Sequence, residues 1–440
     1  MVAPLRVGIA GLGTVGAEVV RVIERQERAL SARCGRPIRI VAVNARSKTK
    51  KRGLDLGGIA WAKSPMALAT DPQIDCFVEL IGGVDEPAGP AIEAALSSGK
   101  SVVTANKALI AKHGLRLASL AEQHGGALNY EAAVGAAIPV IKTLREGLAG
   151  TEIDRIYGIL NGTCNYILTR MEQEGLSFAE CLADAQRLGY AEANPSFDVD
   201  GHDTAQKLSI LASLAFGTKV AQSAVSVEGI SSIAPEDLTA AADLGYRVKL
   251  LGVAVRTATG IEQRVHPTMV PRASSIAQVM DVTNAVTIDG AGIPPITLVG
   301  AGAGAAATAS AVVADIADVA RGIRTMPFGR PVAKLKQIKK APMERHEGGY
   351  YLRLMARDLP GTAGKIATRL AEQDISIESI MQRHPDGRAG GNGGARKAQP
   401  VPVILVTYAT SEDAVRRALA AVQRDKVISG RPQLIRIEKN

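Results

Sequence analysis

The sequence predicts an α/β protein in which a doubly wound parallel sheet is followed by an α+β domain and a C-terminal ferredoxin-like βαββαβ unit. Three observations support this prediction. Short apolar runs alternate with helix-like stretches over the first ~130 residues, the pattern changes from about residue 131, and a third pattern starts near residue 345. We therefore expect domains at 1–135, 136–307 and 345–440, with a linker at 326–344.

The first domain begins with a strand, a glycine turn and a helix over residues 5–24. Further apolar runs of strand length follow at 38–44, 75–81 and 101–104. Strands that alternate with helices form a parallel sheet with right-handed crossovers. A helix near 308–325 is expected to return to this domain and complete it.

The turn after the first strand is Gly11-Leu12-Gly13-Thr14-Val15-Gly16, a G-x-G-x-x-G pattern. The first glycine permits the tight turn, the second lets a pyrophosphate approach the backbone, and the third allows close helix–strand packing. With an apolar strand before it and an amphipathic helix after it, the pattern predicts a Rossmann-type dinucleotide site. Gly82, which follows the third apolar run, is expected to lie at the same site. The alternative is that the glycines serve only the turn.

The loop after the second strand bears on the choice of cofactor. NAD enzymes usually place a carboxylate there, which accepts from the ribose 2′-hydroxyl. This loop has none, and Arg46 and Lys48 could instead pair with a 2′-phosphate. We predict NADP, with NAD as the alternative if the two side chains are solvated loop charges. Lys107 follows the fourth strand, at the sheet edge where ligands bind, although a lone surface lysine is the other interpretation.

The middle domain is predicted to contain both strands and helices, as in an α+β fold. Strand-like runs lie at 151–160, 220–230, 244–256 and 261–270. Helix-like runs lie at 165–175, 177–189 and 203–216. The small-residue run 300–324 is expected to begin as a loop and continue as a helix, and Pro327 and Pro331 mark the break after it.

The C-terminal unit has six predicted elements in βαββαβ order. Strands are expected at 350–356, 375–382, 402–409 and 433–438, and helices at 363–372 and 411–423. A turn, Asp358-Leu359-Pro360-Gly361, follows the first strand. Residues 384–400 are rich in Gly, Arg and Lys, which predicts a mobile hairpin loop.

The densest reactive residues lie between 160 and 207. The polar loop Leu160-Asn161-Gly162-Thr163-Cys164 opens a helix and can offer N–H groups to a carboxylate, although an ordinary capped helix start looks similar. Asp203 and Lys207 are four residues apart, so they share one helix face. They form either a simple ion pair or a pair in which the carboxylate orients an alcohol and the lysine takes its proton. Four carboxylates lie between residues 192 and 203, and several of them facing one cavity would suit the ammonium group of an amino acid.

Together these motifs resemble the homoserine dehydrogenase family over almost the whole chain. The matching segments are the glycine loop, Asn106-Lys107-Ala108-Leu109-Ile110, Glu131-Ala132-Ala133-Val134 through Pro139, Gly158 through Leu168, and Gly189-Tyr190-Ala191-Glu192 through Leu208. The resemblance implies reversible, NAD(P)-dependent interconversion of L-homoserine and L-aspartate 4-semialdehyde in threonine, methionine and isoleucine biosynthesis. Ala301 and Ala307 depart from the Arg or Pro residues of many members, which leaves local cofactor contacts open.

The resemblance also implies residue roles. Lys207 would be the acid/base for the substrate hydroxyl, with Asp203 beside it and Lys107 near the nicotinamide. The implied substrate-binding residues are Glu192 and Asp198 for the amino end, and Tyr190, Gly162 and Thr163 for the α-carboxylate. The implied ligands of a monovalent cation, usually sodium, are Glu131 and the carbonyls of Val134, Ala136 and Ile138.

The C-terminal βαββαβ order with its Asp358–Gly361 turn resembles an ACT domain. Such domains pair and bind amino acids, so the implied effector is threonine, the pathway end product. The alternative is a domain used only for assembly. A homodimer through the middle domain is expected, extended to a homotetramer if the terminal units also pair.

Charge, cysteine content and hydrophobicity limit the possible binding partners and location of the protein. The net charge of +9 is not gathered into one long tract and has no interleaved aromatic residues, so we expect no nucleic-acid partner. The four cysteines lack paired or metal-ligand spacing, and no signal peptide or bilayer-length apolar stretch is evident, which favours a cytoplasmic protein without a membrane partner. Two alternatives remain: another amino-acid dehydrogenase on the same fold, and a non-catalytic amino-acid sensor.

Overall fold

Six parallel strands form a sheet at the N-terminal end of the molecule, in the order β3-β2-β1-β4-β5-β6. The computed structural model describes residues 2–343, 346–382 and 400–438. The strands are β1 (Leu5–Ala10), β2 (Ile38–Asn44), β3 (Ala60–Trp61), β4 (Cys76–Glu79), β5 (Ser101–Thr104) and β6 (Leu128–Asn129). Because the strand order reverses beside β1, the predicted doubly wound topology is confirmed.

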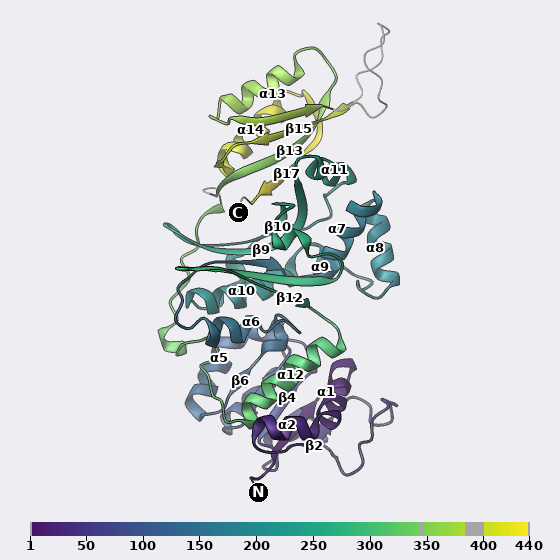
Figure 1. Ribbon diagram of the computed structural model, residues 1–440, viewed down its shortest axis with the longest axis vertical. Helices are drawn as coiled ribbons and strands as arrows, with labels where there is room; N and C mark the ends of the chain where they lie inside the picture. The colour runs from purple at the N-terminus through teal and green to yellow at the C-terminus, as the bar shows by residue number, and fades with distance from the viewer. Residues whose placement is uncertain (1, 344–345, 383–399, 439–440) are drawn as a thin grey trace.

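Helices cover both faces of this sheet (Figure 1). They are α1 (Thr14–Arg25), α2 (Glu27–Cys34), α3 (Pro65–Thr70), α4 (Ala88–Ser97), α5 (Lys107–His124) and, from much later in the chain, α12 (Ala305–Ala320). Helix α12 lies beside α1, and its Val312 and Ile316 are fully buried in the same cluster as Val19 and Val20 of α1. The helix expected near 308–325 therefore packs on the N-terminal sheet.

The middle of the molecule is built on one end of a second, eleven-stranded sheet. Nine of its strands follow the order β12-β11-β7-β9-β10-β17-β13-β15-β14, and two short strands lie off this path, β8 beside β10 and β16 beside β13. Its strands here are β7 (Ile153–Ile159), β8 (Ser226–Val227), β9 (Tyr246–Thr257), β10 (Gly260–Pro271), β11 (Thr283–Gly290) and β12 (Ile293–Ala301). The helices are α6 (Val140–Lys142), α7 (Gly162–Glu174), α8 (Phe178–Arg187), α9 (Ser196–Val199), α10 (His202–Phe216) and α11 (Pro235–Asp243).

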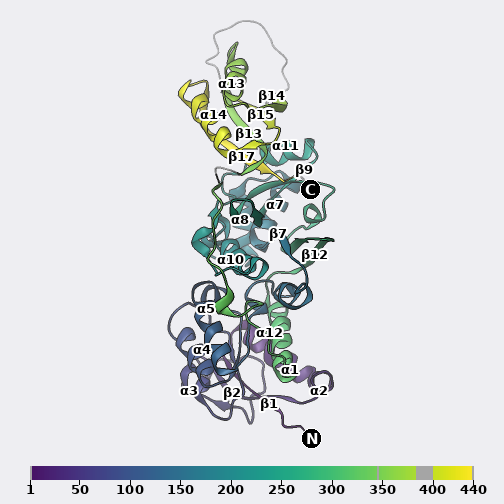
Figure 2. The ribbon, with the colours of Figure 1, turned by 90° about the vertical axis from the view of Figure 1, so that its left-hand side faces the viewer.

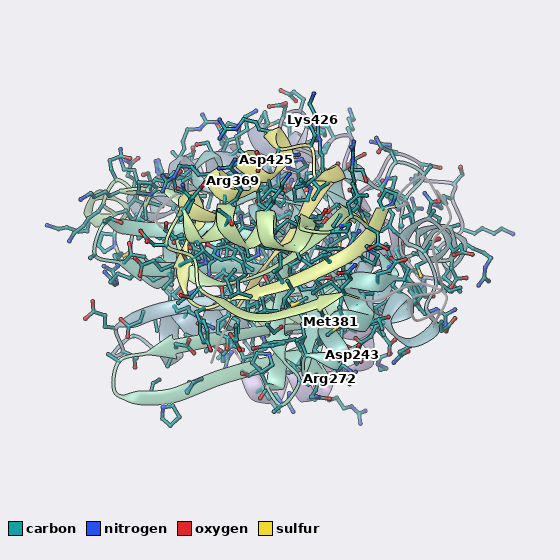
Figure 3. The ribbon with its side chains drawn as sticks, turned by 90° about the horizontal axis from the view of Figure 1, so that it is seen from above. Asp243, Arg272, Arg369, Met381, Asp425 and Lys426 are labelled. Atoms are coloured by element: carbon teal, nitrogen blue, oxygen red, sulfur yellow. The ribbon has the colours of Figure 1, made fainter. Side chains whose placement is uncertain are left out.

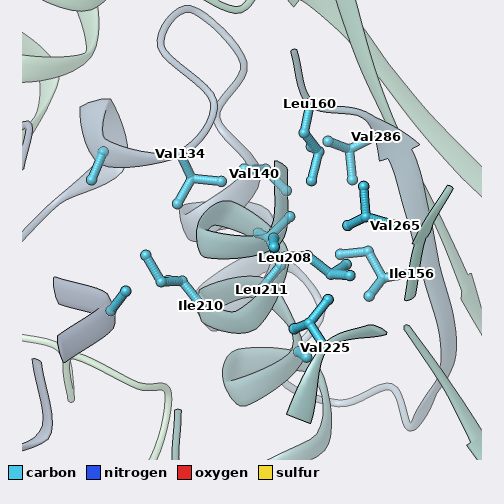
Figure 4. Packing of buried hydrophobic residues seen from close by; sticks show 14 of the residues in the cluster. Val134, Val140, Ile156, Leu160, Leu208, Ile210, Leu211, Val225, Val265 and Val286 are labelled. Atoms are coloured by element: carbon cyan, nitrogen blue, oxygen red, sulfur yellow. The ribbon is translucent and has the colours of Figure 1, made fainter. Parts of the chain in front are cut away.

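Helix α10 is the centre of this domain's core. Its Leu208 and Leu211 pack toward Ile156 of β7 and Val286 of β11 (Figure 4). Thirteen of its fifteen residues are buried, so the polar side chains that it carries are buried with it. The reactive pair of the sequence motif is thus held on one of the most enclosed helices of the structure.

Two expectations for this domain were only partly right. The run 220–230 is mostly irregular, with a 3-10 turn at Gln222–Ala224 and only the short strand β8. Gly300 and Ala301, expected to begin a loop, instead end the strand β12, which pairs with β11 as a hairpin, and the expected loop and helix follow at 302–304 and Ala305–Ala320. Strand β12 contains Pro294 and Pro295, and prolines in a sequence argue against a strand. They are tolerated in β12 because it is at the edge of its sheet.

The C-terminal unit has the predicted βαββαβ order. It comprises β13 (Glu347–Arg357), α13 (Thr362–Ala371), β14 (Ile377–Gln382), β15 (Pro400–Thr407), the short β16 (Thr410–Ser411), α14 (Glu412–Arg424) and β17 (Ile428–Ile437). Its strand order, β17-β13-β15-β14, is antiparallel throughout, as in ferredoxin-like folds. The loop predicted at 384–400 lies outside the described residues apart from Pro400.

The C-terminal unit is continuous with the middle domain and lies at the opposite end of the molecule from the parallel sheet (Figure 2). Strand β17 pairs in parallel with β10, with Arg436 opposite Thr268 and Ile437 opposite Met269. All four cysteines are buried and free. Within the described ranges, no helix has the length and apolar character needed to cross a membrane.

Candidate active site

A buried carboxylate organises the carboxyl edge of the parallel sheet. Glu79, at the end of β4, is fully buried. Its Oε1 accepts from the backbone N–H groups of Ile81 (2.7 Å) and Gly82 (2.9 Å), and its Oε2 accepts from Thr104 Oγ1 (2.6 Å). These bonds join β4, the Gly82 loop and β5. Sequence reasoning missed Glu79, because its place inside an apolar strand was the only signal.

The same network places Lys107. The Asn106 side chain accepts from Leu109 N–H (3.1 Å), which caps α5, and donates to the Gly83 carbonyl (2.6 Å). The backbone N–H of Asn106 donates to Thr104 Oγ1 (3.0 Å). Lys107 therefore begins α5 at a defined point above the sheet edge, where a ligand of a doubly wound fold binds.

The glycine turn leaves space where its second glycine lies. A Cβ on Gly11, whose φ is +102°, would be 2.5 Å from the Leu80 carbonyl oxygen, and a Cβ on Gly16 would be 1.9 Å from the Gly11 oxygen. A Cβ on Gly13 would meet nothing within 4 Å. Gly13 also precedes α1, whose first N–H groups lack a side-chain cap. The first and third glycines are required by packing, and the open side at Gly13 suits a pyrophosphate.

The basic loop after β2 lies beside this turn. Arg46 and Lys48 are exposed, and Lys48 Nζ is 5.8 Å from the centre of the Trp61 ring. Arg52 was not predicted as a site residue, although it belongs to the same basic cluster in the sequence. Its Nε donates to the Leu12 carbonyl (2.9 Å), so it ties the basic loop to the glycine turn.

Two lysines from different helices meet at one carboxylate. Asp203 of α10 is 4% exposed, and Lys207 Nζ donates to its Oδ2 (2.9 Å) and to the Leu160 carbonyl (2.7 Å). Lys107 Nζ of α5 is 3.1 Å from the other oxygen of Asp203. Burial on its own would raise the pKa of Asp203, but the charges of Lys207 and Lys107 outweigh it and hold that pKa below its usual range. Asp203 is therefore ionised between two cations.

Asn161 connects Asp203 and its two lysines, which we call the lysine group, to residues 189–200, which we call the acidic loop. Its side-chain Nδ2 donates to Asp198 Oδ1 (2.8 Å) and to Asp203 Oδ2 (3.0 Å), and its Oδ1 caps α7 by accepting from Cys164 N–H (2.9 Å). Burial, together with the charge of Asp203, raises the pKa of Asp198. Asn161 belongs to a motif found in the sequence, but no role was predicted for it, although its position before a helix is a capping signal.

The remaining residues predicted to bind the substrate are Gly162, Thr163, Tyr190 and Glu192. Thr163 Oγ1 donates to the Tyr190 carbonyl (2.8 Å), and the Tyr190 ring meets Tyr166 edge-on at 5.1 Å. Gly162 is the first residue of α7, where a Cβ would be 2.6 Å from the Val282 oxygen. Glu192 is exposed, and among the described residues no hydrogen bond or ion pair joins its carboxylate to Lys207 or Asp203. The structure thus brings Gly162, Thr163 and Tyr190 together and leaves Glu192 outside the lysine group.

Glu131 lies in a tight turn between the two domains. It is 2% exposed, and its carboxylate accepts from the N–H groups of Ile141 (2.8 Å) and Lys142 (2.9 Å). Burial, reinforced by the charge of Asp315, raises the pKa of Glu131 to about 7. In the following turn Ala136 has a φ of +46°, which is unusual for a residue with a Cβ. In the described ranges, no group of three or more His, Cys, Asp and Glu side chains could hold a metal.

Comparison with known proteins gives consistent results. A family model described as "Homoserine dehydrogenase" matches residues 139–317, and one described as "Homoserine dehydrogenase, NAD binding domain" matches 11–131. Proteins named homoserine dehydrogenase from Pseudomonas aeruginosa and Neisseria gonorrhoeae are 43% and 40% identical, each over 99% of both chains. The crystal structure of a homoserine dehydrogenase from Thiobacillus denitrificans has a TM-score of 0.90 at 41% identity, covering 99% of this chain and 98% of that one. A hyperthermophilic archaeal homoserine dehydrogenase in complex with NADPH has a TM-score of 0.63 at 26% identity, covering 73% and 99%.

Proposed function

The chain belongs to the homoserine dehydrogenase family, and we propose that its catalytic group is formed where α5 and α10 meet. It is an oxidoreductase that interconverts L-homoserine and L-aspartate 4-semialdehyde, with a nicotinamide-dinucleotide-binding domain. The observation that carries the proposal is the convergence of Lys207 and Lys107 on the buried carboxylate of Asp203, next to the carboxyl edge of the parallel sheet.

Lys207 is the proposed acid/base. In the reductive direction its ammonium gives a proton to the carbonyl oxygen at C4 of the semialdehyde, and in the oxidative direction its neutral amine takes the proton of the C4 hydroxyl. Asp203 and the Leu160 carbonyl hold Nζ in position for this transfer. Lys107 adds a second positive charge, which stabilises negative charge that develops on the same oxygen. When bound, the dinucleotide would supply or accept the hydride at C4 of the substrate.

The proposed substrate contacts follow from charge. The N-terminus of α7, with Gly162 and Thr163 and supported by Tyr190, offers N–H groups and a positive dipole end to the α-carboxylate. Asp198 of the acidic loop would bind the ammonium group of the substrate. Glu192 is proposed for the ammonium as well, from its place in the acidic loop rather than from a contact.

NADP is the proposed dinucleotide, with NAD as the alternative. The open side of Gly13 accommodates the pyrophosphate, and Gly82 lies on the neighbouring loop that Glu79 holds. Arg46 and Lys48 are exposed beside this turn and would pair with a 2′-phosphate. Domain 1–135 together with α12 would bind the dinucleotide, and domain 136–307 the substrate.

We also propose a sodium ion near Glu131. The residues present fit such a cation: the Glu131 carboxylate is buried, and the carbonyls of Val134 and Ala136 accept no hydrogen bond from other described residues. The Ile138 carbonyl is the fourth proposed ligand, although it also accepts from Val140 N–H (2.8 Å). Oxygen ligands suit a hard cation, which would stabilise the turn between the two domains.

The C-terminal unit is proposed to be an ACT domain that binds threonine and inhibits the enzyme. The support is the βαββαβ order with the β17-β13-β15-β14 sheet. A homodimer through the middle domain, or a homotetramer, is proposed for the assembly. Threonine titration of the intact enzyme tests the effector, and sedimentation velocity tests the assembly.

The reaction itself is tested by initial rates. The absorbance of the reduced nicotinamide is followed with homoserine and either NADP or NAD, and other small hydroxy and amino acids serve as substrate controls. Oxidation of homoserine, with a lower KM for NADP, is the expected result. Faster turnover of another substrate would point to a different dehydrogenase, and no turnover of any substrate would favour an amino-acid sensor.

A further inference from the structure

Residues 226–237, which we call the bridging segment, lie between the acidic substrate loop and the C-terminal unit. The segment begins with β8 and ends in the first turn of α11. Strand β8 pairs in parallel with β10, with Val227 opposite Val265, and Glu228 N–H donates to the Val265 carbonyl (2.7 Å). The bridging segment is therefore fixed to the same strand that joins β17 of the C-terminal unit.

On one side the bridging segment supports the loop that carries Asp198. Ile230 N–H donates to the Val199 carbonyl (2.9 Å), and Ile230 is fully buried. A Cβ on Gly229 would lie 2.3 Å from that carbonyl oxygen and 2.6 Å from Asp200 Cα, so the two backbones are in direct contact. Any shift of the segment at 228–230 must therefore move the backbone next to Asp198.

The contact extends to the start of α10. Gly201, at the N-cap of α10 with a φ of +87°, faces the segment, and a Cβ there would be 3.1 Å from Val227 Cγ1 and 3.6 Å from the Glu228 oxygen. Helix α10 carries both Asp203 and Lys207 in its first two turns. The segment thus touches both ends of the short stretch that holds the acidic loop against α10.

On the other side the C-terminal unit holds the segment through two ionic contacts, one at the partly exposed Glu228 and one at the fully buried Asp237. Arg436 of β17, 2% exposed, donates to both oxygens of Glu228 (2.8 and 2.9 Å) and to both oxygens of Glu412 (2.7 and 2.8 Å). Arg353 of β13 donates to both oxygens of the fully buried Asp237 (2.6 and 3.0 Å). Tyr351 Oη also donates to Asp237 (2.9 Å). Each end of the bridging segment is therefore bound by an arginine of the C-terminal unit.

We propose that Glu228 and Arg436 are positioning residues for the substrate loop, and that the C-terminal unit holds Asp198 in place for the substrate ammonium through residues 228–230. The proposal rests on the proposed role of Asp198. Neither positioning residue contacts the lysine group, so their effect passes through the Gly229–Val199 backbone contact. Substrate binding responds to the geometry of this pair, whereas dinucleotide binding at the distant glycine turn does not.

The first test is Glu228→Gln, which removes the charge but keeps the shape. Arg436 keeps both bonds to Glu412, and Glu228 is partly exposed, so the fold should survive. A charged hydrogen bond at a partly exposed site is worth about threefold to tenfold in affinity. We expect the KM for homoserine to rise about threefold to tenfold, with kcat and the KM for NADP within about twofold of wild type. Glu228→Ala should have the larger effect.

The matched control is Asp425→Asn. Asp425 also accepts from both ends of an arginine fork, Arg369 Nε (2.7 Å) and Nη2 (2.9 Å), but this pair lies within the C-terminal unit (Figure 3). Its KM for homoserine should equal that of wild type. An unchanged KM for Glu228→Gln and Glu228→Ala, or an equal rise for Asp425→Asn, would overturn the proposal. If wild type itself does not oxidise homoserine, the proposed function fails, and hydrogen exchange at 196–201 in Glu228→Gln then decides by itself whether the bridging segment positions the loop.

A double-mutant cycle separates positioning from general loosening. If Glu228 acts through Asp198, Glu228→Gln should raise the KM for homoserine less than twofold in an Asp198→Asn background, where the ammonium contact is already weakened. An equal effect of Glu228→Gln in both backgrounds would mean that the segment does not act on Asp198. Hydrogen exchange at 196–201, faster in Glu228→Gln than in Asp425→Asn, is the structural readout of the same link.

Discussion

Lys207→Met is the sharpest perturbation of the proposed chemistry. Methionine keeps the length and apolar stem of the side chain but removes the Nζ that contacts Asp203 and Leu160. General acid–base catalysis is worth about 10²–10⁴-fold, and a positive charge near the reacting oxygen is lost as well. We expect kcat to fall by about 10³–10⁴-fold, which corresponds to about 4–5 kcal/mol of transition-state stabilisation.

The variant should nevertheless fold, because Asp203 retains partners. Breaking a buried ion pair typically costs about 3–5 kcal/mol when a charge is left alone. Here Asn161 Nδ2 still donates to Asp203 (3.0 Å), and Lys107 Nζ remains 3.1 Å away. We therefore expect a loss of about 2 kcal/mol in the free energy of unfolding, measured by urea denaturation.

The assay follows reduced nicotinamide with saturating homoserine, and fluorescence titration measures dinucleotide affinity separately. Lys249→Met is the control, because Lys249 is another buried lysine that donates to a carbonyl, at Val279, but does not contact Asp203. Its kcat should stay within about tenfold of wild type. If Lys207→Met also retains kcat within tenfold while binding the dinucleotide normally, another group moves the proton and the assignment is refuted.

Three further predictions concern the cofactor, the cation and pH. The double variant Arg46→Ala/Lys48→Ala should raise the KM for NADP about tenfold and leave the KM for NAD within threefold; equal changes would remove both residues from 2′-phosphate recognition. Glu131→Gln should abolish any rise in melting temperature when sodium chloride replaces choline chloride at constant ionic strength, and a retained rise would place the cation elsewhere. Burial lowers the pKa of Lys249 to about 7, below its value in the unfolded chain, so the unfolded state binds the extra proton between these values and stability rises with pH above about 7. Lys249→Met should flatten that rise in thermal melts, and an unchanged slope would show that Lys249 titrates normally.

Local patterns in the sequence predicted the fold where each element carries its own signal. Four of the six parallel strands are apolar runs, the glycine turn has a fixed spacing, and the C-terminal strands and helices alternate clearly. Strands β3 and β6 were not predicted, because each is only two residues long. The hairpin of β11 and β12 was missed because Pro294 and Pro295 argue against a strand unless its position at a sheet edge is known. Edge position is a property of the assembled sheet.

The candidate active site was predictable only where local sequence spacing determines a contact. Asp203 and Lys207 are four residues apart on a helix and therefore share one face, so their contact could be expected from that spacing. The approach of Lys107 depends on how two domains pack, and no spacing encodes it. Asn161 and Glu79 were missed because amides and buried carboxylates act here by hydrogen bonding to backbone and neighbours, which only the folded chain reveals.

The continuity of the large sheet determines how regulation can be tested. Removing 345–440 would expose the stretch of β10 that pairs with β17, and would leave the fully buried Asp237 without Tyr351 and Arg353. An exposed strand edge invites aggregation, and an unpaired buried carboxylate is strongly destabilising. Loss of activity on truncation would therefore follow whether or not the unit binds an effector. Only the intact chain, titrated with threonine and compared with point variants of the bridging segment, can distinguish an effector site from a structural support.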